Sequence, residues 1–308
     1  SPAAAAAAAR RRGWQIFGFA FLFRLQSYVL GGGAPLDTLL KVDILNIMGP
    51  SIVLAALLWR AAGSLGWRCA VFAAATAITA FATPQVRGAR LDWLPDFIEA
   101  YVVPVAGLSN FVFFPWMALV FAGAFVGVLI DAVASPAVER RLNVRLALGA
   151  AAVIVVTYAA SHLPALVSES YFWTSSPSYL FIRAGFVTLG IAVAYAWTTA
   201  FEHRSRAVGS RPVAAAGGEP RTASPRTAIV TGRWSPLATL GRTSLFVYWI
   251  HVELVYGLVS RPLHHSLTLL QAWIAYVLFT TAMLGCALMK ERIADRFQAQ
   301  RRRVAAAA

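Results

Sequence analysis

Residues 240–257, LGRTSLFVYWIHVELVYG, have the length and the apolar character of a helix that crosses a membrane. The same stretch carries His251 and Glu253 near its middle. An ionisable side chain at the centre of a bilayer costs about 2.5–3.5 kcal/mol on insertion scales, and such groups face a partner or a water-filled cavity. The stretch therefore predicts a membrane helix that contributes polar side chains to a site inside a helical bundle.

The rest of the chain has the same apolar character. Of its 308 residues, 59% are hydrophobic and 13% are charged, whereas a soluble domain carries about 25% charged residues. Apolar windows of about 20 residues, the length of one helical span, lie near residues 13–30, 44–62, 67–84, 111–131, 146–164, 178–200, 241–259 and 269–289. The sequence therefore predicts an all-α fold, a polytopic helical membrane bundle of about eight transmembrane helices.

The 27 lysine and arginine residues are distributed unevenly among the segments that join these spans. If the N-terminus is cytoplasmic, the outer segments carry only Lys41, Arg87, Arg90 and Arg261. The positive-inside rule then places both termini of the chain in the cytoplasm. Topology and contact with anionic lipid account for the net charge of +14, so the predicted partner is the lipid bilayer and not nucleic acid.

Composition divides the chain further. The Arg-, Ser-, Pro- and Gly-rich stretch 202–236 lacks periodicity, which is typical of a flexible linker. Both ends of the chain are basic and low in complexity, and we predict a loop at the start and a disordered tail at the end. The predicted parts are a basic cytoplasmic segment 1–12, a six-span bundle 13–201, a cytoplasmic linker 202–236, a two-span unit 237–290 and a basic cytoplasmic tail 291–308.

Small residues at one position predict helix association. Gly123 and Gly127 form a GxxxG pattern in an apolar span. Small residues four apart allow another helix to approach closely. We therefore expect this face to pack against a helix, and a homo-oligomer is possible.

Several polar or aromatic residues share the outer half of the predicted bundle when the spans are traced through the membrane. They fall at the outer ends of spans or a turn or two inside them. Arg24 and Arg183 are candidate ligands for an anionic cofactor. The candidate substrate-pocket residues are Asp43, Asn46, Asn110, Trp116 and Tyr248.

His251 and Glu253 are the candidate catalytic residues. They stand about 200° apart around a helix, so one faces the site while the other faces a partner. The arrangement we predict pairs Glu253 with Arg24 or Arg183 and leaves His251 as a general base; the reverse is possible, and so is a purely structural ion pair. His264 and His265 lack a third ligand, so no metal site is predicted.

Three stretches resemble one protein family. They are LLKVDILNIMGPSIVLAALL (39–58), NFVFFPWMALVFAGAFVGVL (110–129) and LGRTSLFVYWIHVELVYG (240–257). Together they resemble bacterial relatives of heparan-alpha-glucosaminide N-acetyltransferase, a family of multi-span membrane acyltransferases. The resemblance extends over most of residues 11–290.

The resemblance implies an enzyme of the bacterial inner membrane. It would transfer an acetyl group from cytosolic acetyl-CoA, its donor substrate, to an amino sugar or glycan on the far side. The family's pattern normally opens with two further spans, whose outer loop carries the histidine assigned to acetyl transfer. The sequence begins at the third span of that pattern, and His251 does not match that histidine.

Two other functions fit the residues alone. A transporter or flippase would use buried arginine, histidine and glutamate to bind an anion or a proton, and inverted repeats or broken helices would favour it. No repeat is evident in the sequence. A non-catalytic membrane scaffold would use the same charges to fix helix register.

Overall fold

The computed structural model describes residues 2–30, 35–163, 171–209, 236–256 and 266–307. Within these ranges every extended regular element is a helix. The chain divides into two compact units, Ser1–Val213 and Ala214–Ala308, and each is described by itself.

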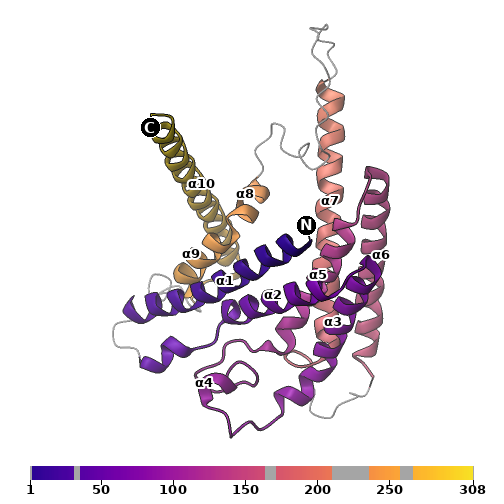
Figure 1. The fold of residues 1–308 in the computed structure, drawn as a ribbon, viewed down its shortest axis with the longest axis vertical. Coiled ribbons are helices and arrows are strands. Elements are labelled where there is room, and N and C mark those ends of the chain that lie inside the picture. Colours follow the sequence, from indigo (N-terminus) through magenta and orange to yellow (C-terminus); the bar gives the residue numbers. More distant parts are fainter. Residues whose placement is uncertain (1, 31–34, 164–170, 210–235, 257–265, 308) are drawn as a thin grey trace. The chain divides into compact units, whose positions relative to one another are not determined.

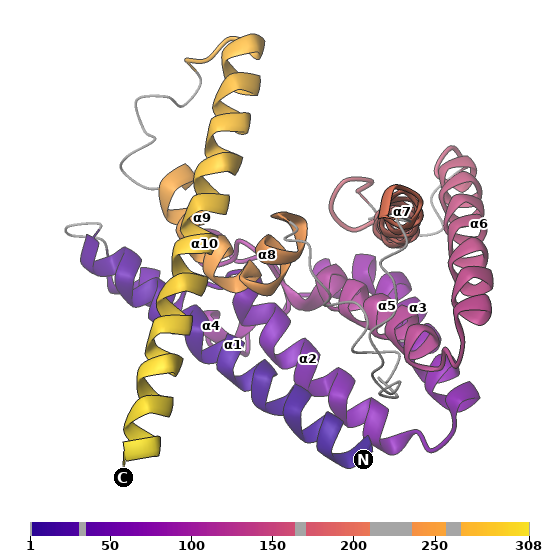
Figure 2. The ribbon, with the colours of Figure 1, turned by 90° about the horizontal axis from the view of Figure 1, so that it is seen from above.

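The first unit is a series of helices joined mostly by short segments (Figure 1). In chain order they are α1 (Pro2–Leu30), the 3-10 helix η1 (Leu36–Leu40), α2 (Ile44–Ala61), α3 (Leu65–Arg87), α4 (Asp96–Glu99), α5 (Phe113–Asp131), α6 (Pro136–Ala160) and α7 (Pro177–Gly209). Helices α1 and α2 lie side by side in both ribbon views, as do α6 and α7 (Figures 1 and 2).

The second unit contains α8 (Pro236–Arg242), α9 (Ser244–Tyr256) and α10 (Leu269–Ala307). Helix α10 packs on both α8 and α9. Near the basic end of this unit, Arg242 Nε donates a hydrogen bond to Glu291 Oε1 at 3.1 Å, and the Lys290 ammonium lies 5.2 Å from the ring centre of Phe246. Polar contacts thus tie α8 and α9 to the long helix.

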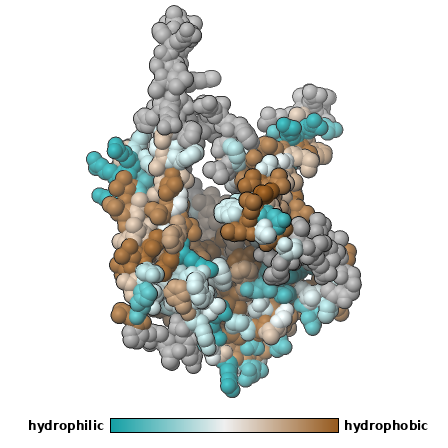
Figure 3. All heavy atoms as spheres, turned by 180° about the vertical axis from the view of Figure 1, so that it is seen from behind, coloured by the Kyte–Doolittle hydropathy of each residue, from teal (hydrophilic) through white to brown (hydrophobic). Residues whose placement is uncertain are grey.

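Among the described residues, six helices are long and apolar enough to cross a membrane. They are α2, α3, α5, α6, the Pro177–Ala200 part of α7 and the Leu269–Gln300 part of α10. Large apolar side chains stand exposed on them, such as Leu148 at 68% and Leu270 at 70%, and apolar residues cover much of the surface in Figure 3. Since such surfaces are stable only against lipid, the predicted all-α membrane bundle is confirmed.

Two of the predicted spans differ from expectation. Residues 13–30 are helical within α1, but Gln15, Arg24 and Gln26 lower their hydropathy, and they are not among the six. The span predicted at 241–259 is interrupted at Thr243, where α8 ends and α9 begins. The hydroxyl and the backbone N–H of Thr243 both donate to the backbone oxygen of Thr239, at 2.8 and 3.1 Å, and such a side-chain bond often bends a helix.

Helices extend into segments where sequence composition predicted none. Helix α1 begins at Pro2, α7 continues to Gly209 beyond the predicted start of the linker, and α10 continues to Ala307. The loop predicted at the start of the chain and the disorder predicted at its end are therefore wrong. Alanine is the strongest helix former, and both terminal segments are rich in it. Residues 210–235 of the predicted linker lie outside the described ranges.

Helices α1 and α2 approach each other closely at glycines that the sequence analysis did not single out. A Cβ atom added to Gly13 of α1 would lie 2.7 Å from the backbone oxygen of Gly49 in α2. At Gly123 and Gly127, by contrast, an added Cβ would meet no described atom within 4 Å. Within the described part of the chain no helix packs on these two glycines, and association of this face with a second copy stays a prediction.

The segment between α3 and α5 folds back onto the start of α2. The backbone N–H of Val42 donates to the oxygen of Leu108 at 2.7 Å, and the N–H of Asn110 donates to the oxygen of Val42 at 2.9 Å. Beneath this bridge, Val42, Ile47 and Ala100 are fully buried and form a small core. The bridge therefore fixes the end of α2 against the segment that leads into α5.

Candidate functional site

A cluster of polar side chains surrounds Asp43, at the N-terminal end of α2. Arg24 of α1 donates from Nη2 to Asp43 Oδ2, and the two side chains are each only 12% exposed. Asn110 donates from Nδ2 to the other carboxylate oxygen, Oδ1, at 3.1 Å. The carboxylate is thus held between a guanidinium and an amide from segments far apart in the sequence. We call Arg24, Asp43, Asn46, Tyr101 and Asn110 the Asp43 cluster.

Backbone geometry explains why Asp43 occupies this position. Asp43 is the N-cap residue of α2, with extended φ and ψ of −113° and 176°. Its backbone N–H donates to Asn46 Oδ1 at 2.9 Å. In a capping box the side chain of the third helical residue accepts such a bond from the N-cap backbone. The same Asn46 donates from Nδ2 to Tyr101 Oη at 3.3 Å. Asn46 therefore connects the helix start to the segment between α4 and α5.

Tyr101 joins the cluster through its hydrogen bond with Asn46, although the sequence analysis did not single it out. Its ring packs against those of Phe113, at 5.8 Å between centroids, and Phe17, at 6.5 Å. Burial raises the pKa of the Tyr101 phenol, and the hydrogen bond from Asn46 lowers it by a smaller amount. The phenol therefore stays neutral at physiological pH. No sequence signal identified it, because a single tyrosine in a mixed apolar and acidic segment matches no pattern.

The raised pKa predicts how stability depends on alkaline pH. Above the ordinary pKa of 10.0, the unfolded chain loses the Tyr101 proton while the folded protein keeps it. The unfolded state then binds fewer protons, so the free energy of unfolding falls as the pH rises. We expect the melting temperature of wild type to fall more steeply above about pH 10 than that of Tyr101→Phe. Parallel curves for the two proteins would contradict this.

The cluster still has hydrogen-bonding capacity to offer a ligand. Arg24 Nε is buried and has no hydrogen-bond partner among the described residues. Asn110 is exposed at the surface of the cluster. A carboxylate, a guanidinium and an amide together offer donors and acceptors of the kind that orient a polar ligand.

Arg183 lies in an aromatic setting. Its Nη2 donates to the hydroxyl of Tyr179 at 2.5 Å, and its guanidinium carbon lies 4.1 Å from the Tyr179 ring centre and 5.2 Å from that of Trp116. The rings of Phe172 and Trp173 pack on Tyr179 at 5.2 and 5.1 Å. Cations over aromatic faces are attracted by the ring quadrupole. In the described part of the chain no carboxylate contacts Arg183.

Trp116 connects Arg183 with the Asp43 cluster. Its ring packs edge-on against Phe111 at 5.0 Å, and it contacts the core of Val42, Ile47 and Ala100 that supports the cluster. Four of the predicted site residues are thus connected by hydrogen bonds and an ion pair. The four are Arg24, Asp43, Asn46 and Asn110. Trp116 contacts the core that supports them, and Arg183 contacts the ring of Trp116.

The predicted catalytic residues belong to the second unit. His251 of α9 packs against Phe279 of α10 at 6.1 Å and against Tyr248 at 6.3 Å between ring centroids. His251 and Tyr248, three residues apart, thus share a helix face. The side chain of Glu253 lies outside the described residues, and the described partner of Arg24 is Asp43 rather than Glu253.

No metal site occurs in the described ranges, since no three histidine, cysteine, aspartate or glutamate residues there lie close enough to hold an ion. His264 and His265 fall outside those ranges. The six apolar helices and the Asp43 cluster define an integral membrane protein with a cluster of polar side chains at the N-terminal end of α2. Comparisons of the chain with protein-family models, with curated proteins and with solved structures found no match.

Proposed function

We propose that the protein is a transmembrane acyltransferase, which moves an acetyl group from cytosolic acetyl-CoA to an amino sugar or glycan on the far side. The Asp43 cluster carries the proposal. Asp43 belongs to the first of the stretches that resemble the N-acetyltransferase family, and Asn110 opens the second. Their side chains, 67 positions apart, hydrogen-bond at 3.1 Å. Two of the stretches that together resemble the family thus contribute to one polar site.

The cluster suits the acceptor better than the donor. Asp43 already neutralises Arg24, so the pair offers little net attraction to the anionic phosphates of acetyl-CoA. Its carboxylate and the Asn110 amide instead match the hydroxyl and amine groups of a sugar. Arg183, which contacts no described carboxylate, is the better candidate for an anionic group of the donor.

The proposed reaction is a simple acyl transfer. The acceptor nitrogen or oxygen attacks the thioester carbonyl, the new bond to that carbon forms, the carbon–sulfur bond breaks and the coenzyme A thiolate leaves. The acceptor loses one proton, which requires a base with a pKa near neutrality. From the sequence, His251 stays our candidate for this role, since histidine is the side chain that most often acts as a general base.

The proposal extends to location. An enzyme using cytosolic acetyl-CoA and an extracytoplasmic acceptor must span the membrane that separates them. We place the protein in the bacterial inner membrane with both ends of this chain in the cytoplasm. The arginine-rich segments then face the cytoplasm, as the positive-inside rule requires.

A structural role is the second candidate, and one observation favours it. Asp43 caps α2 and neutralises Arg24 of the neighbouring helix, which is enough to account for both residues without any ligand. A scaffold would need this pair to hold α1 against α2. The two functions differ in what they require of Asn110. An acyltransferase would use its amide to bind the acceptor, whereas a scaffold would need it less, because Asn110 is exposed.

Asn110→Ala tests the function. In membranes containing the protein expressed from its complete native gene, we expect wild type to transfer radiolabelled acetyl from acetyl-CoA to glucosamine. Loss of a hydrogen bond to a charged group is worth about 1.5–3 kcal/mol, so the variant should be at least about tenfold slower. Gln15→Ala, an exposed amide of α1 outside the cluster, is the control. Absent transfer by wild type, or equal rates in the three proteins, would refute the proposal.

A further inference from the structure

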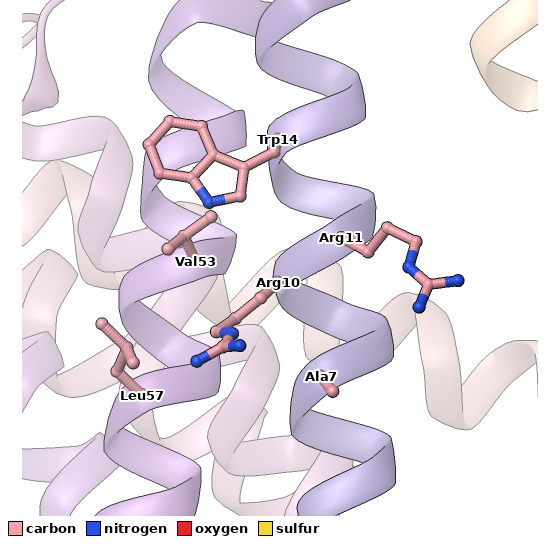
Figure 4. A pocket seen from close by; sticks show the side chains of 6 residues that line it. All are labelled: Ala7, Arg10, Arg11, Trp14, Val53 and Leu57. Carbon is pink, nitrogen blue, oxygen red and sulfur yellow. The ribbon is translucent and has the colours of Figure 1, made fainter.

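A groove runs between α1 and α2 at the arginine-rich end of α1. It has a volume of about 410 Å³ and is lined by Ala7, Arg10, Arg11, Trp14, Val53 and Leu57. In Figure 4 the side chains of Arg10 and Trp14 extend toward α2, whereas Arg11 extends away from it. Sites for small ligands commonly measure about 300–1,000 Å³, so the groove has room for a headgroup and the start of an acyl chain.

The shape of the groove follows from the residues at helix spacing. At Gly13 and Gly49 the two backbones approach so closely that neither position has room for a Cβ. One turn from Gly13 toward the N-terminus of α1, the residue facing α2 is Arg10. One turn further in the same direction it is Ala7, whose side chain is too small to fill the space beside Leu57. The groove is therefore built into the helix packing.

Its lining combines positive charge with apolar surface. Trp14 is 56% exposed and Leu57 is 44% exposed. Within the described residues neither Arg10 nor Arg11 forms an ion pair, and no acidic residue lines the groove. Tryptophan is enriched at the level of lipid headgroups. The groove therefore offers unneutralised cations beside an interfacial indole and a short apolar wall.

We propose that this groove binds an anionic phospholipid. The phosphate lies at Arg10, the glycerol region lies against Trp14, and one acyl chain runs along Val53 and Leu57. Charge complementarity selects this occupant, since basic pockets between membrane helices bind anionic headgroups. The site is separate from the Asp43 cluster and does not depend on the acyltransferase proposal.

Native mass spectrometry in detergent tests the site. The probes are phosphatidylglycerol and phosphatidylcholine with identical acyl chains, so that only the headgroup charge differs. One arginine near a membrane surface contributes enough to change anionic lipid binding about fivefold. We expect Arg10→Gln to weaken phosphatidylglycerol binding by about that factor. Arg12→Gln removes the same charge from an exposed position outside the groove, and its binding should stay close to wild type.

A second variant tests the groove without changing its charge. Leu57→Trp fills the apolar wall and should reduce phosphatidylglycerol binding while the protein still melts cooperatively. Equal losses in Arg10→Gln and Arg12→Gln would mean diffuse attraction to basic residues and would overturn the proposal. So would equal binding of the two lipids. Coenzyme A, added as a soluble phosphate-bearing competitor, should not displace the lipid; displacement at Arg10 would assign the groove to a nucleotide instead.

Discussion

Gly49→Ala should destabilise the first unit by about 1–3 kcal/mol, the usual cost of forcing extra volume into a packed interface. A Cβ at this position would lie 2.8 Å from the backbone oxygen of Gly13 and 2.8 Å from the backbone nitrogen of Phe17. These are main-chain atoms of α1, so no side-chain rotation relieves the contact. The two helices must move apart, which also disturbs the contacts along the rest of their interface.

The matched control is Gly18→Ala on the partner helix, where an added Cβ meets nothing within 4 Å. Alanine exceeds glycine in helix propensity by about 1 kcal/mol, so this variant should be neutral or slightly stabilised. Melting in detergent can be followed with a thiol-reactive dye, since Cys69 is free and only partly exposed. If Gly49→Ala melted at the temperature of wild type and Gly18→Ala, the close approach of α1 and α2 would be wrong.

The fold class was predictable because membrane insertion depends on composition summed over about 20 residues. The ends of the helices were not, because low complexity suggested loops where alanine in fact extends α1 and α10. The close packing of α1 on α2 was also not predicted. Gly123 and Gly127 have the GxxxG spacing, yet Gly13 and Gly49, which are isolated in the sequence, make the contact. Which glycine meets which helix depends on tertiary register, and one sequence does not encode it locally.

The site was partly predictable for a similar reason. Tracing the spans through the membrane gives the depth of each polar residue, and this was enough to group Arg24, Asp43, Asn46 and Asn110. Depth does not give the rotation of a helix or its neighbours. The ion pair between Arg24 and Asp43 was therefore not predicted; the sequence suggested instead that Glu253 pairs with Arg24 or Arg183, and the side chain of Glu253 lies outside the described residues. Tyr101 was missed because its contribution arises from the fold of its segment.

Asp43→Asn should be the most damaging change in the Asp43 cluster. Asparagine keeps the shape and the capping ability of aspartate but removes the charge that neutralises Arg24. Breaking a buried pair by removing one partner costs about 3–5 kcal/mol, since the other charge stays buried and uncompensated. Glu291→Gln makes the same chemical change in the ion pair of Arg242 with Glu291. The side chain of Arg242 is 64% exposed and that of Glu291 is 29% exposed. This control should lose less than about 1 kcal/mol.

A double variant separates stability from function. In Arg24→Met, Asp43→Asn both charges are absent, and replacing a buried ion pair as a unit is often close to neutral. We expect its melting temperature to recover most of the loss seen in Asp43→Asn. If the stable double variant no longer transfers acetyl groups, the pair contributes to acceptor binding as well as to helix packing. If it transfers them at the wild-type rate, Arg24 and Asp43 act only to hold α1 against α2, and the acceptor site must lie elsewhere.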